Sequence, residues 1–233
     1  MKLILAVVLC LALGVSSSTV EISPFLINGI RVPTAPYFAL INYHRTVGQE
    51  TLGFFGGGAL ISLRHVLTAA TNVVDFVVTV HMGSTHRNSL VNHPLQPNGI
   101  TSHPNYNNVT RANDIAIIRL LNNVLPSAAV APISLAPDAN PPLILPFEFE
   151  EGSFVGFGYQ SLASNAAPQN LYQGFQRVIN QPRCQQFFNV NANTVFCAED
   201  VVERSNGCDG DIGNPFVVSY RREDILVGIL SIH

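Results

Sequence analysis

The pattern of hydrophobic and polar positions along the chain predicts a protein built from short strands. Apolar runs rich in β-branched and aromatic residues recur along the sequence, and Gly, Pro and Asn separate them. This pattern is typical of a β-barrel or β-sandwich, and no heptad repeat or convincing amphipathic helix interrupts it. We therefore expect an all-β fold. The runs fall at residues 36–43, 59–67, 76–82, 115–120, 153–158, 195–198 and 225–231.

The first residues carry a different pattern, which is typical of a secretory signal peptide. Lys2 precedes an unbroken apolar run over residues 3–13, and small residues follow at 14–18. The run is shorter than the about 20 apolar residues that a membrane-spanning helix needs. We expect a signal peptide over residues 1–17 and a secreted, extracellular protein. The alternative interpretation is that the run forms a buried first strand or helix.

Composition and charge indicate a folded protein and argue against several classes of ligand. The 233 residues, 47% hydrophobic and 12% charged, supply ample core for one large all-β domain or two small ones. A net charge of -3 leaves no basic stripe to neutralise phosphates, so we expect no nucleic-acid partner. Four histidines are spaced unlike zinc ligands, so we expect no metal and no cofactor. They are His81, His86, His93 and His103.

An odd number of cysteines remains once the signal peptide is removed. Cys10 lies in the apolar run, so Cys184, Cys197 and Cys208 are left in the secreted chain. An oxidising compartment allows disulfides. A bridge between Cys184 and Cys197 would close a short loop, worth about 3 kcal/mol in the chain-entropy model. One thiol must then stay unpaired or bond elsewhere.

Three stretches carry recognisable motifs. Residues 207–215 read Gly-Cys-Asp-Gly-Asp-Ile-Gly-Asn-Pro, residues 57–71 include Gly-Gly-Ala-Leu-Ile-Ser and Leu-Thr-Ala-Ala-Thr, and residues 113–116 read Asn-Asp-Ile-Ala. They resemble the nucleophile, histidine and carboxylate blocks of the chymotrypsin/trypsin-like serine protease family. At the family's three catalytic positions, its serine is replaced by isoleucine, its histidine is replaced by threonine and its aspartate is kept. These residues are Ile212, Thr71 and Asp114.

The resemblance implies a chymotrypsin-like fold of two six-stranded Greek-key β-barrels. The domain would cover residues 26–233, with the barrels at about 26–130 and 131–233, and residues 18–25 would be a short pro-segment. The Ala- and Pro-rich residues 125–142 would form the crossover between the barrels. In the family, the second barrel continues beyond the last strand found here, so we expect this barrel to be truncated at the C-terminus.

Further site residues follow from the resemblance alone. Cys184 and Cys197 match a family disulfide, which leaves Cys208 without a partner. The resemblance also assigns the oxyanion-hole amides, the activation pair and the floor of the specificity pocket. These are Gly210 with Ile212, Leu26 with Asp211, and Asn206.

The family's mechanism needs a hydroxyl nucleophile, an imidazole base and a carboxylate that orients the imidazole. The hydroxyl of Thr71 cannot accept a proton near pH 7, and the alkyl side chain of Ile212 cannot attack a carbonyl. Removing the nucleophile or the base of such a triad lowers turnover by about 10⁶. We expect His65 to be a strand residue that faces packing or solvent, and Ser205 has no visible base, so neither replaces them. We expect no intact catalytic residue and a structural role for Asp114.

These observations favour a binding protein over an enzyme. We expect a secreted, catalytically inactive serine protease homologue that binds extracellular proteins, such as proteases or their inhibitors, as a decoy or cofactor. The alternative is a serine endopeptidase of reduced or relocated activity, and a third interpretation is a gene product without a stable fold. Asn108-Val109-Thr110 is also a glycosylation sequon, which predicts a glycan at Asn108.

Overall fold

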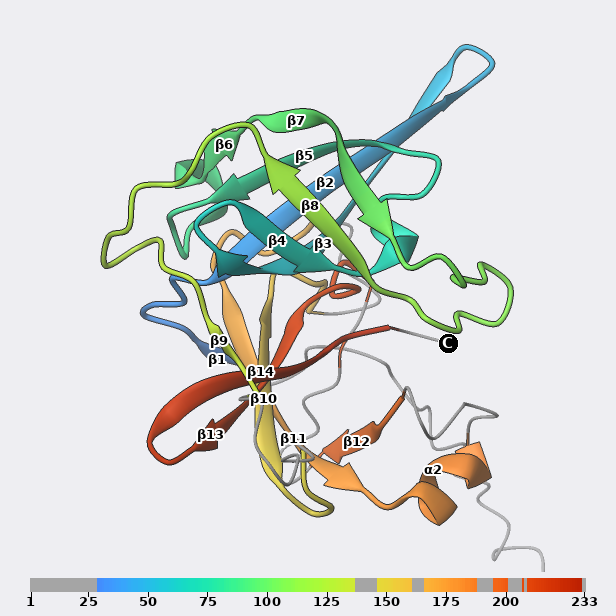
Figure 1. Cartoon of the computed structure of the whole chain (residues 1–233), viewed down its shortest axis with the longest axis vertical. Helices are drawn as coiled ribbons and strands as arrows, with labels where there is room; N and C mark the ends of the chain where they lie inside the picture. Colours follow the sequence, from blue (N-terminus) through green and yellow to red (C-terminus); the bar gives the residue numbers. More distant parts are fainter. Residues whose placement is uncertain are drawn as a thin grey trace, which may run out of the picture.

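Two curled sheets lie one above the other in the computed structural model (Figure 1). The structure describes residues 29–136, 146–160, 166–187, 195–200, 207 and 209–231. Several parts of the sequence-based prediction lie outside these residues: the signal peptide, the pro-segment, Leu26, residues 137–142 of the crossover, Ser205, the pocket floor Asn206 and Cys208. Within the described residues, no helix has the length and apolar content needed to cross a bilayer.

The first sheet holds seven strands in the order β6-β5-β2-β3-β4-β8-β7, and all neighbours are antiparallel. Its side chains alternate between a buried and an exposed face, as in β8, where Ala116, Ile118 and Leu120 are buried. These buried side chains join one hydrophobic core. The elements are β2 (Phe38–Val47), β3 (Glu50–Ser62), β4 (His65–Thr68), β5 (Val77–Met82), β6 (Val91–His93), β7 (Leu95–Ser102) and β8 (Ala116–Leu120), with the 3₁₀ turns η1 (Ala70–Asn72) and η2 (Arg87–Ser89) between them.

The second sheet has the order β1-β11-β10-β13-β14-β9, and β12 also pairs with β11. Its core includes Phe154, Val178 and Phe216. The strand β1 precedes the first sheet in the chain but pairs with β11, so it links the two halves. The elements are β1 (Ile30–Arg31), β9 (Ser134–Leu135), β10 (Glu151–Gly156), β11 (Tyr172–Ile179), β12 (Cys197–Asp200), β13 (Pro215–Tyr220) and β14 (Glu223–Ile229).

The predicted all-β fold in two halves is confirmed, with differences in detail. Each sheet has seven strands rather than six, because strands of two or three residues, such as β9 and β6, extend the edges. The single strand expected at residues 59–67 is wrong, because a turn separates β3 from β4. β3 also includes Gly56 to Gly58, where the backbone passes so close to its neighbours that a Cβ on Gly57 would collide with Asn214.

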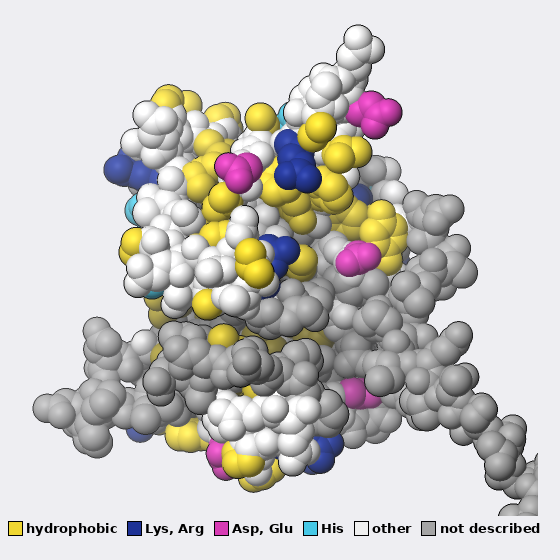
Figure 2. Space-filling model, turned by 90° about the vertical axis from the view of Figure 1, so that its right-hand side faces the viewer, with side chains coloured by type: hydrophobic (Ala, Val, Ile, Leu, Met, Phe, Trp, Pro, Cys, Tyr) yellow, Lys and Arg dark blue, Asp and Glu magenta, His cyan; other side chains and the backbone are white. Residues whose placement is uncertain are grey.

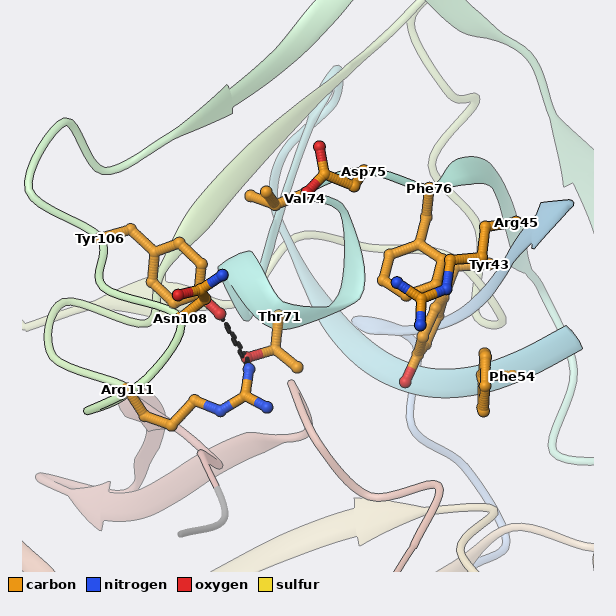
Figure 3. A pocket seen from close by; sticks show the side chains of 10 residues that line it. All are labelled: Tyr43, Arg45, Phe54, Thr71, Val74, Asp75, Phe76, Tyr106, Asn108 and Arg111. Atoms are coloured by element: carbon orange, nitrogen blue, oxygen red, sulfur yellow. Dashed lines mark hydrogen bonds between the residues drawn. The ribbon is translucent and has the colours of Figure 1, made fainter. Parts of the chain in front are cut away.

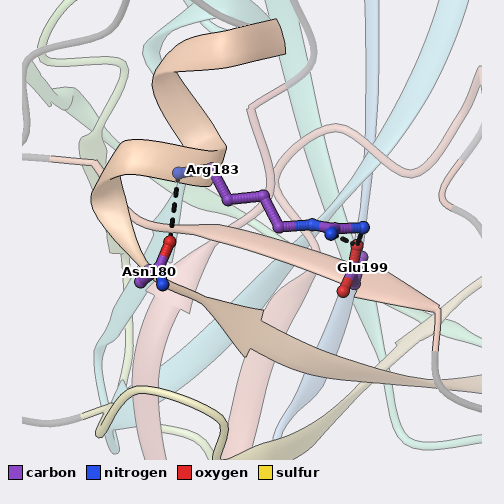
Figure 4. A network of polar contacts seen from close by, with 3 residues as sticks. All are labelled: Asn180, Arg183 and Glu199. Atoms are coloured by element: carbon purple, nitrogen blue, oxygen red, sulfur yellow. Dashed lines mark hydrogen bonds and ion pairs between the residues drawn. The ribbon is translucent and has the colours of Figure 1, made fainter.

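One helix, α2 (Gln181–Phe187), has no counterpart in the sequence pattern. Seven residues are too few to display an amphipathic repeat. Its start is nevertheless marked, because Asn180 accepts a hydrogen bond from the backbone N–H of Arg183 at 3.0 Å through its Oδ1 (Figure 4). Asparagine is among the residues preferred at this capping position.

Two links fix α2 to β12. The predicted disulfide between Cys184 and Cys197 is confirmed. Beside it, Nε and Nη2 of Arg183 donate to Oε2 of Glu199 at 3.0 and 2.6 Å (Figure 4). Both side chains of the ion pair are about half exposed, so the disulfide contributes more to holding the helix than the ion pair does.

The two sheets share a buried joint. Phe38 of β2 packs edge-on against Phe157 of the second half, with ring centroids 5.7 Å apart, in a cluster that includes the fully buried Leu171. The backbone N–H of Leu171 donates to the carbonyl of Thr85 at 2.8 Å, which connects the second half to the first. The positions of the three catalytic blocks meet at one end of this joint.

Candidate functional site

Thr71 and Asp114, which lie 43 residues apart in the sequence, are in direct contact. Thr71 follows β4 in the turn η1, and Asp114 lies just before β8, which pairs with β4. The Asp114 carboxylate accepts three hydrogen bonds: from the backbone N–H of Thr71 at 2.8 Å, from Oγ1 of Thr71 at 2.9 Å and from Oγ of Ser231 at 2.6 Å. One amide and two hydroxyls therefore satisfy this carboxylate.

A cation completes the network on the other side of Thr71. Nη1 of Arg111 donates to Oγ1 of Thr71 at 2.7 Å and to the hydroxyl of Tyr106 at 2.9 Å (Figure 3). Because Oγ1 of Thr71 donates its proton to Asp114, it accepts from Arg111. The Thr71 hydroxyl thus bridges the guanidinium of Arg111 and the carboxylate of Asp114. Arg111 supplies the positive charge near Asp114 that an imidazolium would supply in a triad.

Sequence reasoning did not identify Arg111 or Tyr106. Arg111 adopts φ 55°, a left-handed conformation that is uncommon for a residue with a Cβ, and Asn113 does the same at φ 57°. These turns bring the loop before Asp114 back over Thr71. An arginine three residues before the retained aspartate is visible in the sequence, but only the path of the loop shows that it contacts Thr71.

Ile212 lies beside the first sheet, and its backbone carbonyl is held there by two donors. The backbone N–H of Gly57 and the Nδ2 of Asn72 each donate to it at 2.8 Å. Asn72 is fully buried and also donates to Oγ1 of Thr68 at 3.2 Å. Asn72, which sequence reasoning did not single out, therefore holds the position where the family has its nucleophile.

Asp211 is fully buried and accepts hydrogen bonds from within its own half. The backbone N–H of Gly158 donates to its Oδ1 at 3.0 Å, and Nδ2 of Asn214 donates at 2.7 Å. The Asn214 side chain has room because glycines line its site, and a Cβ on Gly57 or Gly156 would collide with it. The expected partner amine at Leu26 lies outside the described residues.

Gly210 occupies a position that only glycine fits. Its φ is 92°, and a Cβ there would meet the ring of Phe55. The predicted oxyanion-hole amides, those of Gly210 and Ile212, therefore belong to one tight turn that packs against the first sheet.

A cavity of about 320 Å³ opens beside Thr71 (Figure 3). Three aromatic rings form one wall: Tyr43 stacks on Phe54 with centroids 5.6 Å apart and meets Phe76 edge-on at 4.9 Å. Burial, followed by the charge of Asp209, raises the pKa of Tyr43 to about 12, so its hydroxyl stays protonated. The lining residues are Tyr43, Arg45, Phe54, Thr71, Val74, Asp75, Phe76, Tyr106, Asn108 and Arg111.

The histidines lie elsewhere. His81 on β5 and His93 on β6 are on neighbouring strands, and burial lowers the pKa of both. Across the described parts of the chain, no three side chains of His, Cys, Asp or Glu lie close enough together to hold a metal ion.

Comparison with known proteins identifies the family. The family model named Trypsin matches residues 30–233. The chain belongs to the trypsin family. It is 30% identical over 182 residues to trypsin delta of Drosophila erecta, an alignment that covers 75% of this chain and 67% of that protein. It is 31% identical over 183 residues to vitamin K-dependent protein C of Oryctolagus cuniculus, again over 75% of this chain.

The trypsin-family fold is also found in a solved structure. A chain described as GrC superposes with a TM-score of 0.74 at 25% identity, covering 89% of this chain and 88% of that one. The predicted resemblance and its chymotrypsin-like two-barrel fold are therefore confirmed. This chain spans only 40% of the length of the rabbit protein C it matches.

Within the trypsin-family scaffold, the site offers hydrogen-bond donors and aromatic walls. The hydroxyls of Thr71 and Ser231 both donate to Asp114, and in the described residues neither bonds to a histidine. The guanidinium of Arg111 supplies N–H donors and has no acceptor atom.

Proposed function

We propose that this chain is a secreted, catalytically inactive member of the trypsin family that binds other extracellular proteins as a decoy or cofactor. The observation that carries the proposal is the closed network of Asp114, Thr71 and Arg111, with Ile212 at the nucleophile position. A binding role needs the scaffold and its surface, and it needs no proton transfer.

The network differs from a triad in the direction of its hydrogen bonds. A triad carboxylate orients an imidazole whose second nitrogen takes a proton from the nucleophile. Here the carboxylate orients the Thr71 hydroxyl, and the oxygen of that hydroxyl accepts a hydrogen bond from Nη1 of Arg111. A site built in this way holds a charge in place, and the Thr71 hydroxyl supplies no basic nitrogen where the triad has its imidazole.

A protruding hairpin supports a role in protein contact. The tip of β2 and β3 extends beyond β5, because the pairing of β2 with β5 ends at His44 (Figure 1). Val47, Leu52 and Phe54 are 58%, 41% and 45% exposed. Figure 2 shows hydrophobic side chains gathered at the base of this hairpin with charged side chains beside them. Exposed apolar patches of this kind often mark interaction surfaces.

A serine-directed fluorescent phosphonate tests the proposal, since such a probe labels only an activated hydroxyl. The purified secreted chain should show no labelling at probe concentrations that saturate an active trypsin in the same tube. Labelling of the folded chain that disappears when the protein is first denatured by heat would overturn the proposal. Peptide mapping would then identify the labelled residue.

One observation favours a second candidate, an endopeptidase with a relocated dyad. Oγ of Ser62 lies 2.8 Å from Nδ1 of His65 at the turn between β3 and β4. The same oxygen accepts the backbone N–H groups of Arg64 at 3.3 Å and His65 at 3.1 Å. These bonds occupy its lone pairs, so the contact is typical of a turn cap rather than a nucleophile.

The variant Ser62→Ala separates the two candidates. If the relocated dyad were catalytic, Ser62→Ala would abolish any peptide hydrolysis that the chain shows. We expect no peptide hydrolysis by either the wild type or the variant. The variant should lower the free energy of unfolding by about 0.5–1.5 kcal/mol, measured by urea denaturation.

A further inference from the structure

The cavity beside Thr71 contains hydrogen-bond donors that the protein itself does not use. Arg111 bonds to Thr71 and Tyr106 through Nη1 alone. In the described structure its Nε and Nη2 have no partner, and they are not buried. These two N–H groups form the edge of the guanidinium that binds a carboxylate in bidentate fashion.

A second unused donor lies across the cavity. The hydroxyl of Tyr43 has no hydrogen-bond partner among the described residues and faces the same space as Arg111 (Figure 3). Its pKa of about 12 keeps the proton in place throughout the physiological range. The two donors come from opposite sides of Thr71, one from β2 and one from the loop before Asp114.

The remaining walls favour an apolar body attached to a negative charge. The rings of Phe54 and Phe76 meet edge to face with centroids 6.0 Å apart, and the guanidinium of Arg45 lies 5.6 Å from the Phe76 ring. Two arginines and one acidic residue, Asp75, line the cavity. The charges of Asp209 and Asp114 act on Tyr43 from beyond this lining. The nearby Asp114 is already satisfied by three donors.

We propose that this cavity binds a carboxylate attached to an aromatic or branched apolar group. The carboxylate bonds to Arg111 and Tyr43, and the apolar group packs on Phe54 and Phe76. A volume of about 320 Å³ suits one such group, at the lower end of the range for ligand pockets. The ligand is either a free carboxylic acid or the C-terminal residue of a peptide. This inference rests on the proposed binding function and names the ligand chemistry of the same site.

Binding of two matched probes, N-acetylphenylalanine and N-acetylphenylalaninamide, tests the inference by ligand-observed NMR titration. The two differ only in the terminal group, which is a charged carboxylate in the acid and a neutral carboxamide in the amide. The protein is the full secreted chain with Thr110→Ala, which removes the sequon and leaves Asn108 on the cavity wall unchanged. We expect the acid to bind at least about tenfold more tightly than the amide, as a charge-assisted pair of hydrogen bonds implies.

Two pairs of variants locate the site. Arg111→Lys keeps the charge but removes the fork, and it should weaken binding of the acid about tenfold while leaving the amide unchanged. Arg119→Lys makes the same change at an exposed position on β8 and should have no effect. Tyr43→Phe keeps the ring stack, loses the hydroxyl and should weaken the acid severalfold, whereas Tyr220→Phe in the second sheet should not.

Two further ligands distinguish the sources of the carboxylate. 3-Phenylpropionate represents a free acid, and the tripeptide Ala-Ala-Phe represents a peptide C-terminus; tighter binding of either supports the inference and identifies the source.

Equal affinity for acid and amide, or equal losses from Arg111→Lys and Arg119→Lys, would overturn it. Phosphonate labelling of the chain would instead sink the non-catalytic function and leave this result standing.

Discussion

Asn72 has a larger structural role than its sequence position suggests. It is fully buried, and its amide connects Thr68 in the first sheet to the backbone of Ile212 in the second half. The turn η1 places it directly after Thr71, so one short segment contributes both to the polar network and to the joint between the halves.

Replacing Asn72 with alanine should lower the free energy of unfolding by about 1–3 kcal/mol, because two buried hydrogen bonds are lost. Urea denaturation followed by circular dichroism measures the change. Asn88→Ala, on an exposed residue of η2, is the matched control and should change stability by less than about 0.5 kcal/mol. Equal effects of the two substitutions would contradict this role.

Restoring the triad residues should give only slow phosphonate labelling while Arg111 remains. In Thr71→His with Ile212→Ser, the new imidazole would face the guanidinium, whose charge lowers the pKa of the imidazole and disfavours its charged form during catalysis. Adding Arg111→Leu should raise the rate of phosphonate labelling about tenfold, which corresponds to one pKa unit. If the double variant already labels as fast as the triple variant, Arg111 does not control this position.

The catalytic positions could be predicted from the sequence, whereas their surroundings could not. Thr71, Asp114 and Ile212 lie in short motifs whose neighbours are recognisable, so each substitution is visible in the sequence alone. Arg111 and Asn72 matter because of contacts that span 40 and 140 residues. Nothing local in the sequence specifies such contacts, because they depend on the path of the loop and on the docking of the two halves.

Among the elements, β5 and β6 carry a pH-sensitive pair. Burial lowers the pKa of His81, the proximity of His93 lowers it further, and burial also lowers the pKa of His93. The unfolded chain therefore binds more protons than the folded one below the ordinary histidine pKa of 6.5. Stability is complete above that pH and is lost as the pH falls through the folded pKa values.

The free energy of unfolding should accordingly fall as the pH drops below about 6.5, and His81→Gln should make that part of the profile flatter. Denaturation at a series of pH values measures both curves. A slope that His81→Gln does not alter would show that other groups dominate the acid sensitivity.

The loop that carries the sequon is exposed along its length. Asn107 bonds through its side chain to the backbone N–H groups of Val109 and Thr110, both at 2.9 Å, and Val109 is 86% exposed. Asn108 is therefore accessible in the folded chain, and it lies on the rim of the cavity beside Thr71.

We predict that Asn108 carries an N-linked glycan when the chain is made in a eukaryotic secretory pathway. Treatment with an N-glycosidase should then reduce the mass of the wild-type protein by the mass of a glycan, whereas Thr110→Ala should already have the mass of its own unglycosylated sequence. A wild-type mass that the glycosidase treatment does not reduce would refute the prediction.

Strand bounds were less predictable from the sequence than strand existence. Glycines normally weaken strands, yet Gly56 to Gly58 lie inside β3 because Asn72, Asn214 and the Leu67 carbonyl occupy the space where their side chains would be. The helix α2 was missed for a related reason. Its stability comes from a disulfide and a cap, and neither produces a hydrophobic repeat.

For the whole molecule, the joint between the sheets implies one cooperative unit. Leu171 is fully buried between β2 and the second half, and its backbone bonds to Thr85. Leu171→Ala should reduce the free energy of unfolding by about 2–5 kcal/mol. Leu125→Ala, at a position 88% exposed, should change it by less than about 0.5 kcal/mol.

Hydrogen exchange measured by mass spectrometry shows whether both halves respond. Protection of β2 and β3 should fall together with that of β10 and β13 in Leu171→Ala, in a single transition. Loss of protection in one sheet alone would mean that the halves unfold independently. It would also remove the structural reason for treating Ile212 and Thr71 as parts of one site.

The most direct test of the account is peptide hydrolysis by the purified, full-length chain. A peptide library is incubated with the protein, and new termini are identified by mass spectrometry, with an active trypsin and buffer alone as references. The account predicts no cleavage above the buffer background, since Ile212 cannot attack a carbonyl and Thr71 cannot accept a proton. Cleavage that persists through repurification and is blocked by the serine-directed phosphonate would contradict it.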